Sequence, residues 1–430
     1  MQSIYDQILN IILSQEKPAF LDGKDVVVPA YKGLSIANLP GSISRWLDCP
    51  LKDSPPFAPI ISDQFDKEFE HVILLLMDGL NLSIFNQFFN NVIYGKQQKE
   101  WKPFLSKGIY SPLTSIVPST TSAALTTLWT GKLPVEHGII GYELFLKEFG
   151  CITNMITHSA ASFINSQANI AGAGFDPSNF LPVTTLGTHF RNNDVKTHVF
   201  QHHTIVESGL SQMIFRDIES HAFRTESDLW YSVREVFEEK VNPRIFTYIY
   251  WGELDTSSHR SGPLHPRVQE EWNTFAHFLF QFLSTVASSN HRKTLFLLTA
   301  DHGQIPSEIL PEYDLKKHTG LTNHLIMKPT GESRLPFLFI RKGHEENVIR
   351  YLSTHWDGQF DMVPSPVFLN SGLMGFGKAY KGTTDRIGDW VVIPENNAYW
   401  WWVNKENILH GRHGGLSPQE MLVPFFAIEL

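Results

Sequence analysis

The sequence predicts an α/β protein with a doubly wound, mostly parallel sheet, helices on both faces and a small α+β insertion. The first observation is a pair of mostly apolar runs, at residues 71–77 and 294–300, the first with six consecutive apolar residues, which are typical of strands buried on both faces of a sheet. The second is that helix-like patterns separate the strand-like runs. The third is an aspartate after each run, Asp78 and Asp301, where open α/β sheets place their ligands.

Residues 1–70 are expected to form an N-terminal helix and a segment that wraps the core. The helix is predicted to be amphipathic because several of its apolar residues share a side, namely Ile4, Ile8, Leu9, Ile11 and Ile12. The stretch that follows, up to Pro56, is rich in Pro and Asp and has few periodic signals. We therefore expect an extended conformation there.

Residues 71–303 and 411–430 are expected to form the α/β core. Strands are predicted at residues 71–77, 195–200, 244–251 and 294–300. Helices are predicted at residues 83–107, 226–240 and 266–286, and from the hydroxyl residues before Ala123 to the stop signal at Gly131. The small and polar residues of 145–180 predict loops.

Residues 304–410 break this alternation and are expected to form a small α+β lobe beside the site. A helix is predicted at residues 345–355, and strands at residues 335–340, 390–393 and 399–403. The run Trp400-Trp401-Trp402 lies in this lobe, where we expect it to pack against the core rather than to stack on a ligand.

Composition limits the classes of function. The chain has 430 residues, 42% of them apolar and 18% charged, as in ordinary globular proteins. A formal net charge of −9 argues against a nucleic-acid polymer as partner. Two cysteines, Cys49 and Cys151, are too few for a cysteine zinc site and are expected to be separate thiols. No signal-peptide pattern and no apolar run of about 20 residues is present, so we expect a cytoplasmic protein without a membrane partner.

Carboxylates and imidazoles follow the predicted strands. Asp78, Asp255 and Asp301 each follow an apolar run, and Asp255 precedes His259 by one helical turn, so that both can face one point. His302 follows Asp301 directly, and His413 lies in a glycine-rich turn. Each motif alone also fits a capping turn or a solvated helix pair. Their joint occurrence at successive strand ends favours a site for two divalent metals such as zinc or manganese.

Thr120 and Thr121 are candidate nucleophiles. Both stand at the predicted start of a helix, where unsatisfied N–H groups and the positive end of the helix dipole favour a bound phosphate. A metal can deprotonate such a hydroxyl at neutral pH. A plain N-cap is the alternative interpretation for either threonine.

Taken together, these motifs resemble those of the alkaline phosphatase superfamily, and within it the nucleotide pyrophosphatase/phosphodiesterase branch. The motifs follow the family's order from residue 76 to residue 415. They are Leu76-Met77-Asp78-Gly79, Pro118-Ser119-Thr120-Thr121, Thr130-Gly131-Lys132-Leu133-Pro134-Val135-Glu136-His137-Gly138-Ile139, Asp255 with His259, Asp301-His302-Gly303, and His413-Gly414-Gly415.

The resemblance implies two metal sites and a covalent mechanism. One metal would be held by Asp78, Asp301, His302 and the nucleophile oxygen, and the other by Asp255, His259 and His413. The nucleophile would be Thr121, with Thr120 as runner-up. It would attack phosphorus and form a phosphothreonine, which a metal-activated water would hydrolyse. The implied metals are two divalent ions, zinc first and manganese second, and the implied substrate is a small phosphate ester or nucleotide.

The sequence departs from the family pattern at one position that bears on the substrate. Relatives carry there an asparagine that donates to a phosphate oxygen, and this chain has Tyr142, whose phenol could donate one hydrogen bond. His137 is expected to be structural. A phosphomonoesterase is the main alternative, followed by a sulfatase, phosphonate hydrolase or phosphosugar mutase. A catalytically silent binding protein with the same fold is the non-enzyme alternative. The oligomeric state is left open.

Overall fold

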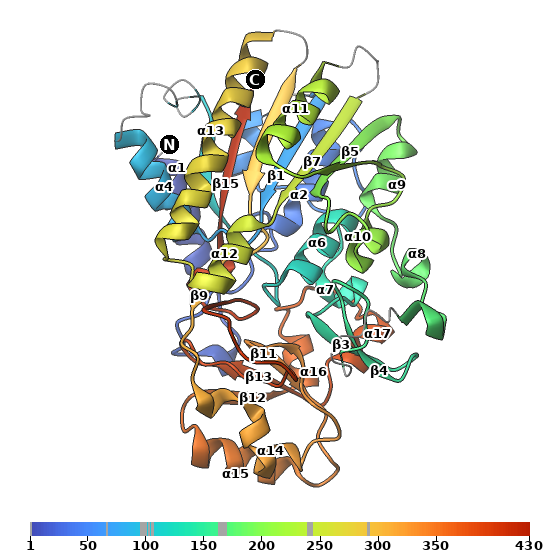
Figure 1. Ribbon diagram of the computed structural model, residues 1–430, viewed down its shortest axis with the longest axis vertical. Helices are drawn as coiled ribbons and strands as arrows, with labels where there is room; N and C mark the ends of the chain where they lie inside the picture. Colours follow the sequence, from blue (N-terminus) through green and yellow to red (C-terminus); the bar gives the residue numbers. More distant parts are fainter. Residues whose placement is uncertain are drawn as a thin grey trace.

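The large sheet of the protein has seven strands in the order β2-β15-β8-β1-β7-β5-β6 (Figure 1). The computed structural model describes residues 2–65, 68–94, 101, 104, 107–161, 170–238, 244–289 and 293–430. The strands of this sheet are β1 (His71–Met77), β2 (Ile109–Thr114), β5 (Val195–His202), β6 (Glu219–Phe223), β7 (Arg244–Trp251), β8 (Thr294–Thr299) and β15 (Leu422–Glu429). Strand β15 pairs antiparallel with both neighbours, whereas β8, β1, β7, β5 and β6 pair in parallel.

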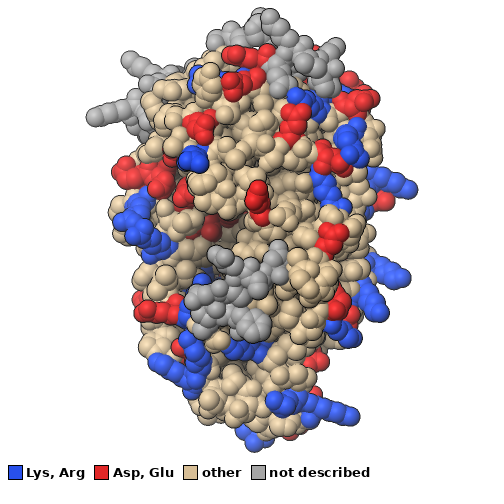
Figure 2. All heavy atoms as spheres, turned by 45° about the vertical axis from the view of Figure 1, so that its right-hand side comes forward, with Lys and Arg blue, Asp and Glu red and all other residues tan. Residues whose placement is uncertain are grey.

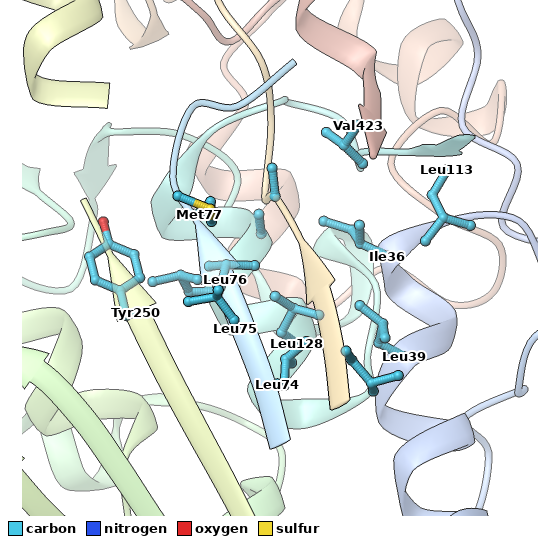
Figure 3. Close-up of a cluster of buried hydrophobic side chains, with 14 of the residues drawn as sticks. Ile36, Leu39, Leu74, Leu75, Leu76, Met77, Leu113, Leu128, Tyr250 and Val423 are labelled. Carbon is cyan, nitrogen blue, oxygen red and sulfur yellow. The ribbon is translucent and has the colours of Figure 1, made fainter. Parts of the chain in front are cut away.

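Strand β1 is buried along its whole length, as its apolar run predicts. It lies between β7 and β8, with Leu76 opposite Tyr250 and Thr299. Figure 3 shows Leu74 to Met77 along this strand, with the Tyr250 hydroxyl pointing toward the same end of the sheet as Met77. Burying a Leu or Met side chain of this strand stabilises the fold by about 1.5–3 kcal/mol.

Helices cover both faces of the large sheet, which confirms the predicted architecture. On one face, Trp129 of α6 (Thr121–Thr130) packs on Tyr248 of β7, and on the other Phe275 of α13 (Pro266–Ser289) packs on Trp251 of the same strand. Longer helices also include α1 (Gln2–Leu13), α2 (Leu39–Trp46), α4 (Leu82–Tyr94), α11 (Glu226–Phe237) and α12 (Glu253–Ser261). Shorter ones are α3 (Pro59–Ser62), α7 (Pro134–His137), α8 (Pro177–Phe180), α9 (Leu186–Arg191), α10 (Gly209–Ile214) and α18 (Pro418–Met421).

A second sheet of six strands, in the order β12-β13-β11-β10-β3-β4, lies below the large sheet in Figure 1. Its strands are β3 (Glu143–Leu146), β4 (Cys151–Asn154), β10 (Thr330–Glu332), β11 (Leu335–Leu338), β12 (Phe360–Pro364) and β13 (Trp390–Pro394). Helices α14 (Thr319–Thr322), α15 (Glu345–His355), α16 (Ser365–Asn370) and α17 (Lys381–Arg386) accompany it, and a two-stranded pair joins β9 (Ile305–Pro306) to β14 (Gly411–Arg412).

Several predicted elements differ from the structure. The loop prediction for residues 145–180 is wrong where β3 and β4 form a hairpin, because strands of four residues are too short to show a clear period. The strand predicted at residues 399–403 is only a single bridge between Asp314 and Trp401. In α1, Ile8 and Ile12 are buried but Ile11 is exposed. The predicted helix at 83–107 corresponds to α4 up to Tyr94, and most of its remainder lies outside the described residues. Residues 239–240 of the helix predicted at 226–240 also lie outside them.

Two further sequence observations can be compared with the fold. Cys49 and Cys151 are both free thiols, as expected. Trp400 is fully buried in the core of the second sheet, as expected for the tryptophan run. Within the described part of the chain, no helix combines the length and the apolar character needed to cross a bilayer.

Candidate metal centre and cleft

Three carboxylates meet at one end of the large sheet. Asp78 follows β1, Asp301 follows β8, and Asp255 lies in the first turn of α12, directly after β7. Gly79 adopts a φ of +74°, and a Cβ there would lie 3.0 Å from the Cα of Asp255, so glycine permits the close approach. Burial, together with the charges of Asp301 and Asp255, raises the pKa of Asp78 well above its ordinary value. Such a cluster needs positive charge to hold it together.

The fold anchors one oxygen of Asp78 and one of Asp301, leaving the second oxygen of each without a hydrogen bond. The Tyr250 hydroxyl donates to Asp78 Oδ2. The backbone N–H groups of Gly79 and His302 donate to Asp301 Oδ1, at 3.3 and 2.9 Å. Asp78 Oδ1 and Asp301 Oδ2 are buried without a hydrogen-bond partner, and each lies 3.4 Å from His302 Nε2. Orphaned buried oxygens of this kind are typical of cation ligands.

Asp255 forms the second part of the cluster together with two histidines. Its Oδ2 lies 3.4 Å from His259 Nε2, one helical turn away in α12, as the spacing predicts. Its Oδ1 lies 4.0 Å from His413 Nε2 and accepts a hydrogen bond from the Gln304 side chain. The His413 ring stacks on that of His302, with centroids 3.9 Å apart, so the two parts of the cluster are continuous.

All three histidines turn the same nitrogen toward the carboxylates. Nδ1 of His259, His302 and His413 lies 2.8, 3.2 and 3.2 Å from the backbone carbonyls of Gly411, Gly303 and Ser119 respectively. A carbonyl can only accept, so each Nδ1 carries a proton, and Nε2 of each ring is the atom that faces the carboxylates and could bind a metal.

Ligand atoms of Asp78, Asp301 and His302 lie within 4.8 Å of one another, as do those of Asp255, His302 and His413. Burial and the neighbouring His302 and His259 lower the pKa of His413 well below its ordinary value, which keeps this ring neutral and able to bind a metal. The donor set therefore fits two divalent cations.

The two candidate threonines face different partners. Thr121 is the first residue of α6, and its hydroxyl lies 3.1 Å from His302 Nε2 and 3.4 Å from Asp78 Oδ2. Thr120, the N-cap residue, makes no side-chain cap and instead bonds the Glu332 carboxyl group. Of the two threonines, only Thr121 has a hydroxyl beside the metal-ligand cluster.

A cleft of about 540 Å³ opens beside the cluster. His259 and His413 line it together with Tyr142, Glu332 and Arg412. Burial raises the pKa of Tyr142, and its side chain bonds Asn154. The backbone N–H of Tyr142 donates to Glu332 Oε1 at 2.7 Å. Tyr142 thus belongs to the cleft wall, but its hydroxyl has a protein partner away from the metal ligands.

Sequence reasoning missed three side chains that position the site. Tyr250 could have been found from its place near the end of β7, two residues before Gly252. Gln304 follows His302 by two residues and holds Asp255. Glu332 gave no signal, because it comes from the second sheet. Burial, as the largest effect, raises the pKa of Glu332 to about 8.

His137 and His410 lie outside the cluster. His137 is buried in α7, where Thr127 Oγ1 of α6 lies 3.0 Å from its Nε2 and the Ile139 N–H donates to its Nδ1. Burial lowers its pKa to about 3. The His410 side chain is exposed, and its backbone N–H donates to the carbonyl of His259 at 2.7 Å.

Comparison with known proteins bears on the chain as a whole. The family model "Type I phosphodiesterase / nucleotide pyrophosphatase" matches residues 72–416. Murine ectonucleotide pyrophosphatase / phosphodiesterase 5 superposes with a TM-score of 0.59 at 15% identity, over 83% of this chain and 87% of that one. Phosphonoacetate hydrolase from Sinorhizobium meliloti 1021, solved with phosphonoformate, superposes with a TM-score of 0.57 at 16% identity, over 83% of this chain and 89% of that one. An inactive variant of the murine protein, solved with AMP, superposes with a TM-score of 0.58 at 14% identity, over 83% of this chain and 87% of that one. No curated protein sequence matches the chain.

Proposed function

The chain belongs to the type I phosphodiesterase / nucleotide pyrophosphatase family and is a phosphoryl hydrolase, and we propose that it cleaves small phosphate diesters or anhydrides through Thr121. The observation that carries this proposal is the Thr121 hydroxyl, at the N-terminus of α6 and beside the carboxylate and imidazole cluster.

Two cations would share the cluster. Asp78, Asp301, His302 and Thr121 would hold one, and Asp255, His259 and His413 would hold the other. We propose zinc, because three imidazole nitrogens among the ligands suit it, with manganese as the alternative. When bound, the cations would lower the pKa of the Thr121 hydroxyl and neutralise charge on the phosphoryl oxygens.

The protein's own groups arrange the reaction. The first turn of α6 presents backbone N–H groups to a phosphoryl oxygen. Thr121 Oγ1 gives its proton to solvent and forms a bond to phosphorus, while the bond from phosphorus to the leaving oxygen breaks and that oxygen departs as an alkoxide or phosphate anion, which takes up a proton from solvent where its pKa requires it. Water then attacks the phosphothreonine, the bond between phosphorus and Thr121 Oγ1 breaks, and the hydroxyl is regenerated.

A diester is the proposed substrate because the cleft extends beyond the metal ligands. About 540 Å³ leaves room for a second ester group next to His259 and His413. The structural relatives also support a small substrate, since the murine protein binds AMP and the hydrolase from Sinorhizobium binds phosphonoformate.

The test is hydrolysis of bis-p-nitrophenyl phosphate against p-nitrophenyl phosphate, with zinc or manganese added. We expect a diester preference that Thr121→Ala abolishes, while Thr120→Ala keeps activity. Thr121→Ser, which retains a hydroxyl, should keep part of it.

Other outcomes would change the proposal in defined ways. A monoester preference would assign a phosphatase with the same residues. Full activity in Thr121→Ala would exclude Thr121 as nucleophile. A protein with two bound metals that cleaves neither ester would contradict the proposed substrate class.

A further inference from the structure

Three arginines are buried among the residues that the structure describes, and they differ in their partners. Arg334 pairs with both oxygens of Glu420, at 3.1 and 2.9 Å, and Arg386 lies 3.2 Å from Glu148. Within the same part of the chain, no carboxylate lies at ion-pair distance from Arg412. Buried charges are normally paired, so Arg412 is the exception that needs an explanation.

Arg412 lies in the wall of the cleft. It belongs to β14, directly precedes the metal-ligand candidate His413, and lines the same cleft as His259. A ligand that reaches from the metal-ligand cluster along this cleft could therefore contact this side chain. Arg334 and Arg386 do not line the cleft.

The guanidinium of Arg412 is held in a fixed orientation. It stacks over the Tyr399 ring, 3.7 Å from the centroid, with the Trp401 ring at 5.3 Å. Its Nη2 donates to Asn407 Oδ1 at 2.6 Å, whereas its Nε is buried without a hydrogen-bond partner. A planar guanidinium held in one orientation in the wall of a cleft is suited to a carboxylate or a phosphate.

The charge on Arg412 remains in the unliganded protein. A guanidinium stays protonated at neutral pH in proteins, so Arg412 carries a positive charge. The aromatic faces of Tyr399 and Trp401 offset part of the cost of taking this charge out of water. Figure 2 shows basic and acidic side chains interspersed over one face of the molecule, so attraction of an anion on that face would be local rather than due to a broad positive field.

We propose that Arg412 binds a second anionic group of the substrate, a carboxylate or a phosphate on the organic substituent of the scissile phosphorus. This inference rests on the proposed hydrolase function and narrows its substrate class. Arg412 would act as a specificity residue that favours doubly anionic diesters or anhydrides over esters with a neutral substituent.

Three diesters with one leaving group test the inference in the zinc-loaded enzyme: methyl, carboxymethyl and 2-phosphoethyl p-nitrophenyl phosphate. We expect kcat/KM for an anionic substituent to be at least about ten times that for methyl. This ratio corresponds to a difference of about 1.4 kcal/mol in activation free energy. The carboxymethyl and phosphoethyl arms distinguish the two kinds of anion. In Arg412→Gln the ratio of anionic to methyl substrate should fall about tenfold, and Arg412→Lys should restore part of it.

Arg386→Gln is the matched control, because it removes a buried arginine outside the cleft and should leave the ratio unchanged. A purely structural role for Arg412 would lower kcat/KM for all three esters in proportion, and that result would overturn the inference. So would a wild-type enzyme that cleaves the methyl ester but shows no preference for charge, a result obtained without any variant. Failure to cleave any of the three esters would instead count against the proposed function itself.

Discussion

At the scale of single residues, the two oxygens of Asp78, and likewise those of Asp301, have different surroundings. In Asp78 and Asp301 one oxygen accepts hydrogen bonds from the protein and the other is left for a ligand. The anchored oxygen fixes the direction in which the other points. Residues that donate to the anchored oxygens should therefore tune metal affinity without touching the metal.

Tyr250→Phe tests this arrangement, because it removes the hydroxyl that donates to Asp78 Oδ2. We expect zinc affinity to fall by about 10- to 100-fold with the fold intact. The measurement is competition for zinc with a chromogenic chelator. Tyr248→Phe is the control, since Tyr248 lies on the same face of β7 but makes no hydrogen bond to a metal-ligand carboxylate. Equal zinc affinity in wild type and Tyr250→Phe would contradict the prediction.

His137 should make the free energy of unfolding depend on pH. Its pKa is about 3 in the folded state and near 6.5 when unfolded, so the unfolded chain takes up the proton first. The stability that it contributes is complete above pH 6.5 and falls by about 1.4 kcal/mol per pH unit as the pH decreases toward 3. Urea unfolding of the metal-free protein at pH 7.5 and pH 5 should show a smaller loss in His137→Gln than in wild type. Identical losses would exclude this role.

The ligand candidates could be predicted from the sequence because they follow strong local signals. Asp78, Asp301 and His302 come directly after buried apolar strands, and Asp255 and His259 share a helical turn. Glu332 could not be recognised, because its role depends on a second sheet that sequence spacing does not reveal. The roles assigned to all of these residues stay predictions until the variants are measured.

At the scale of elements, a buried ion pair connects the second sheet to the metal centre. Arg334, next to β10, pairs with Glu420 in α18, and Glu420 also accepts hydrogen bonds from Gly415 and Ser417. Although burial alone would raise it, the pKa of Glu420 is lowered, chiefly by the charge of Arg334. The turn that carries His413 is thereby fixed from the second sheet.

Glu420→Gln should therefore affect both stability and metal binding. It leaves the Arg334 charge buried without its counterion, which destabilises the fold by about 3–5 kcal/mol. We expect zinc to be lost first from the site of Asp255, His259 and His413, because the His413 turn loses its anchor. Urea unfolding and zinc titration followed by calorimetry measure the two effects. Unchanged stability would show that the pair contributes little.

Elements with long apolar or amphipathic patterns were predictable, and short ones were not. Strands β1, β7 and β8 and helix α13 lie where their patterns place them. The hairpin of β3 and β4 was missed because its pairing with β10 gives it a place that its own residues do not encode.

At the scale of the whole molecule, repulsion among Asp78, Asp255 and Asp301 opposes folding, and bound cations would relieve it. Asp78→Asn removes one of three clustered charges, so in chelator the variant should melt at the same temperature as wild type or higher. Added zinc should raise the melting temperature of wild type but not that of the variant. Differential scanning calorimetry measures both. A variant that melts well below wild type in chelator would show that the repulsion is small.

The position of β15 has a consequence for how the chain is made. This strand lies between β2 and β8, although it follows both in the sequence, and its partner β2 ends at Thr114. During synthesis on the ribosome, β2 therefore has no strand partner in the large sheet until β15, residues 422–429, has been translated. The nascent protein passes through a long interval in which an apolar strand edge is open to wrong partners. A chaperone that shields β2 over that interval would protect the sheet until β15 inserts.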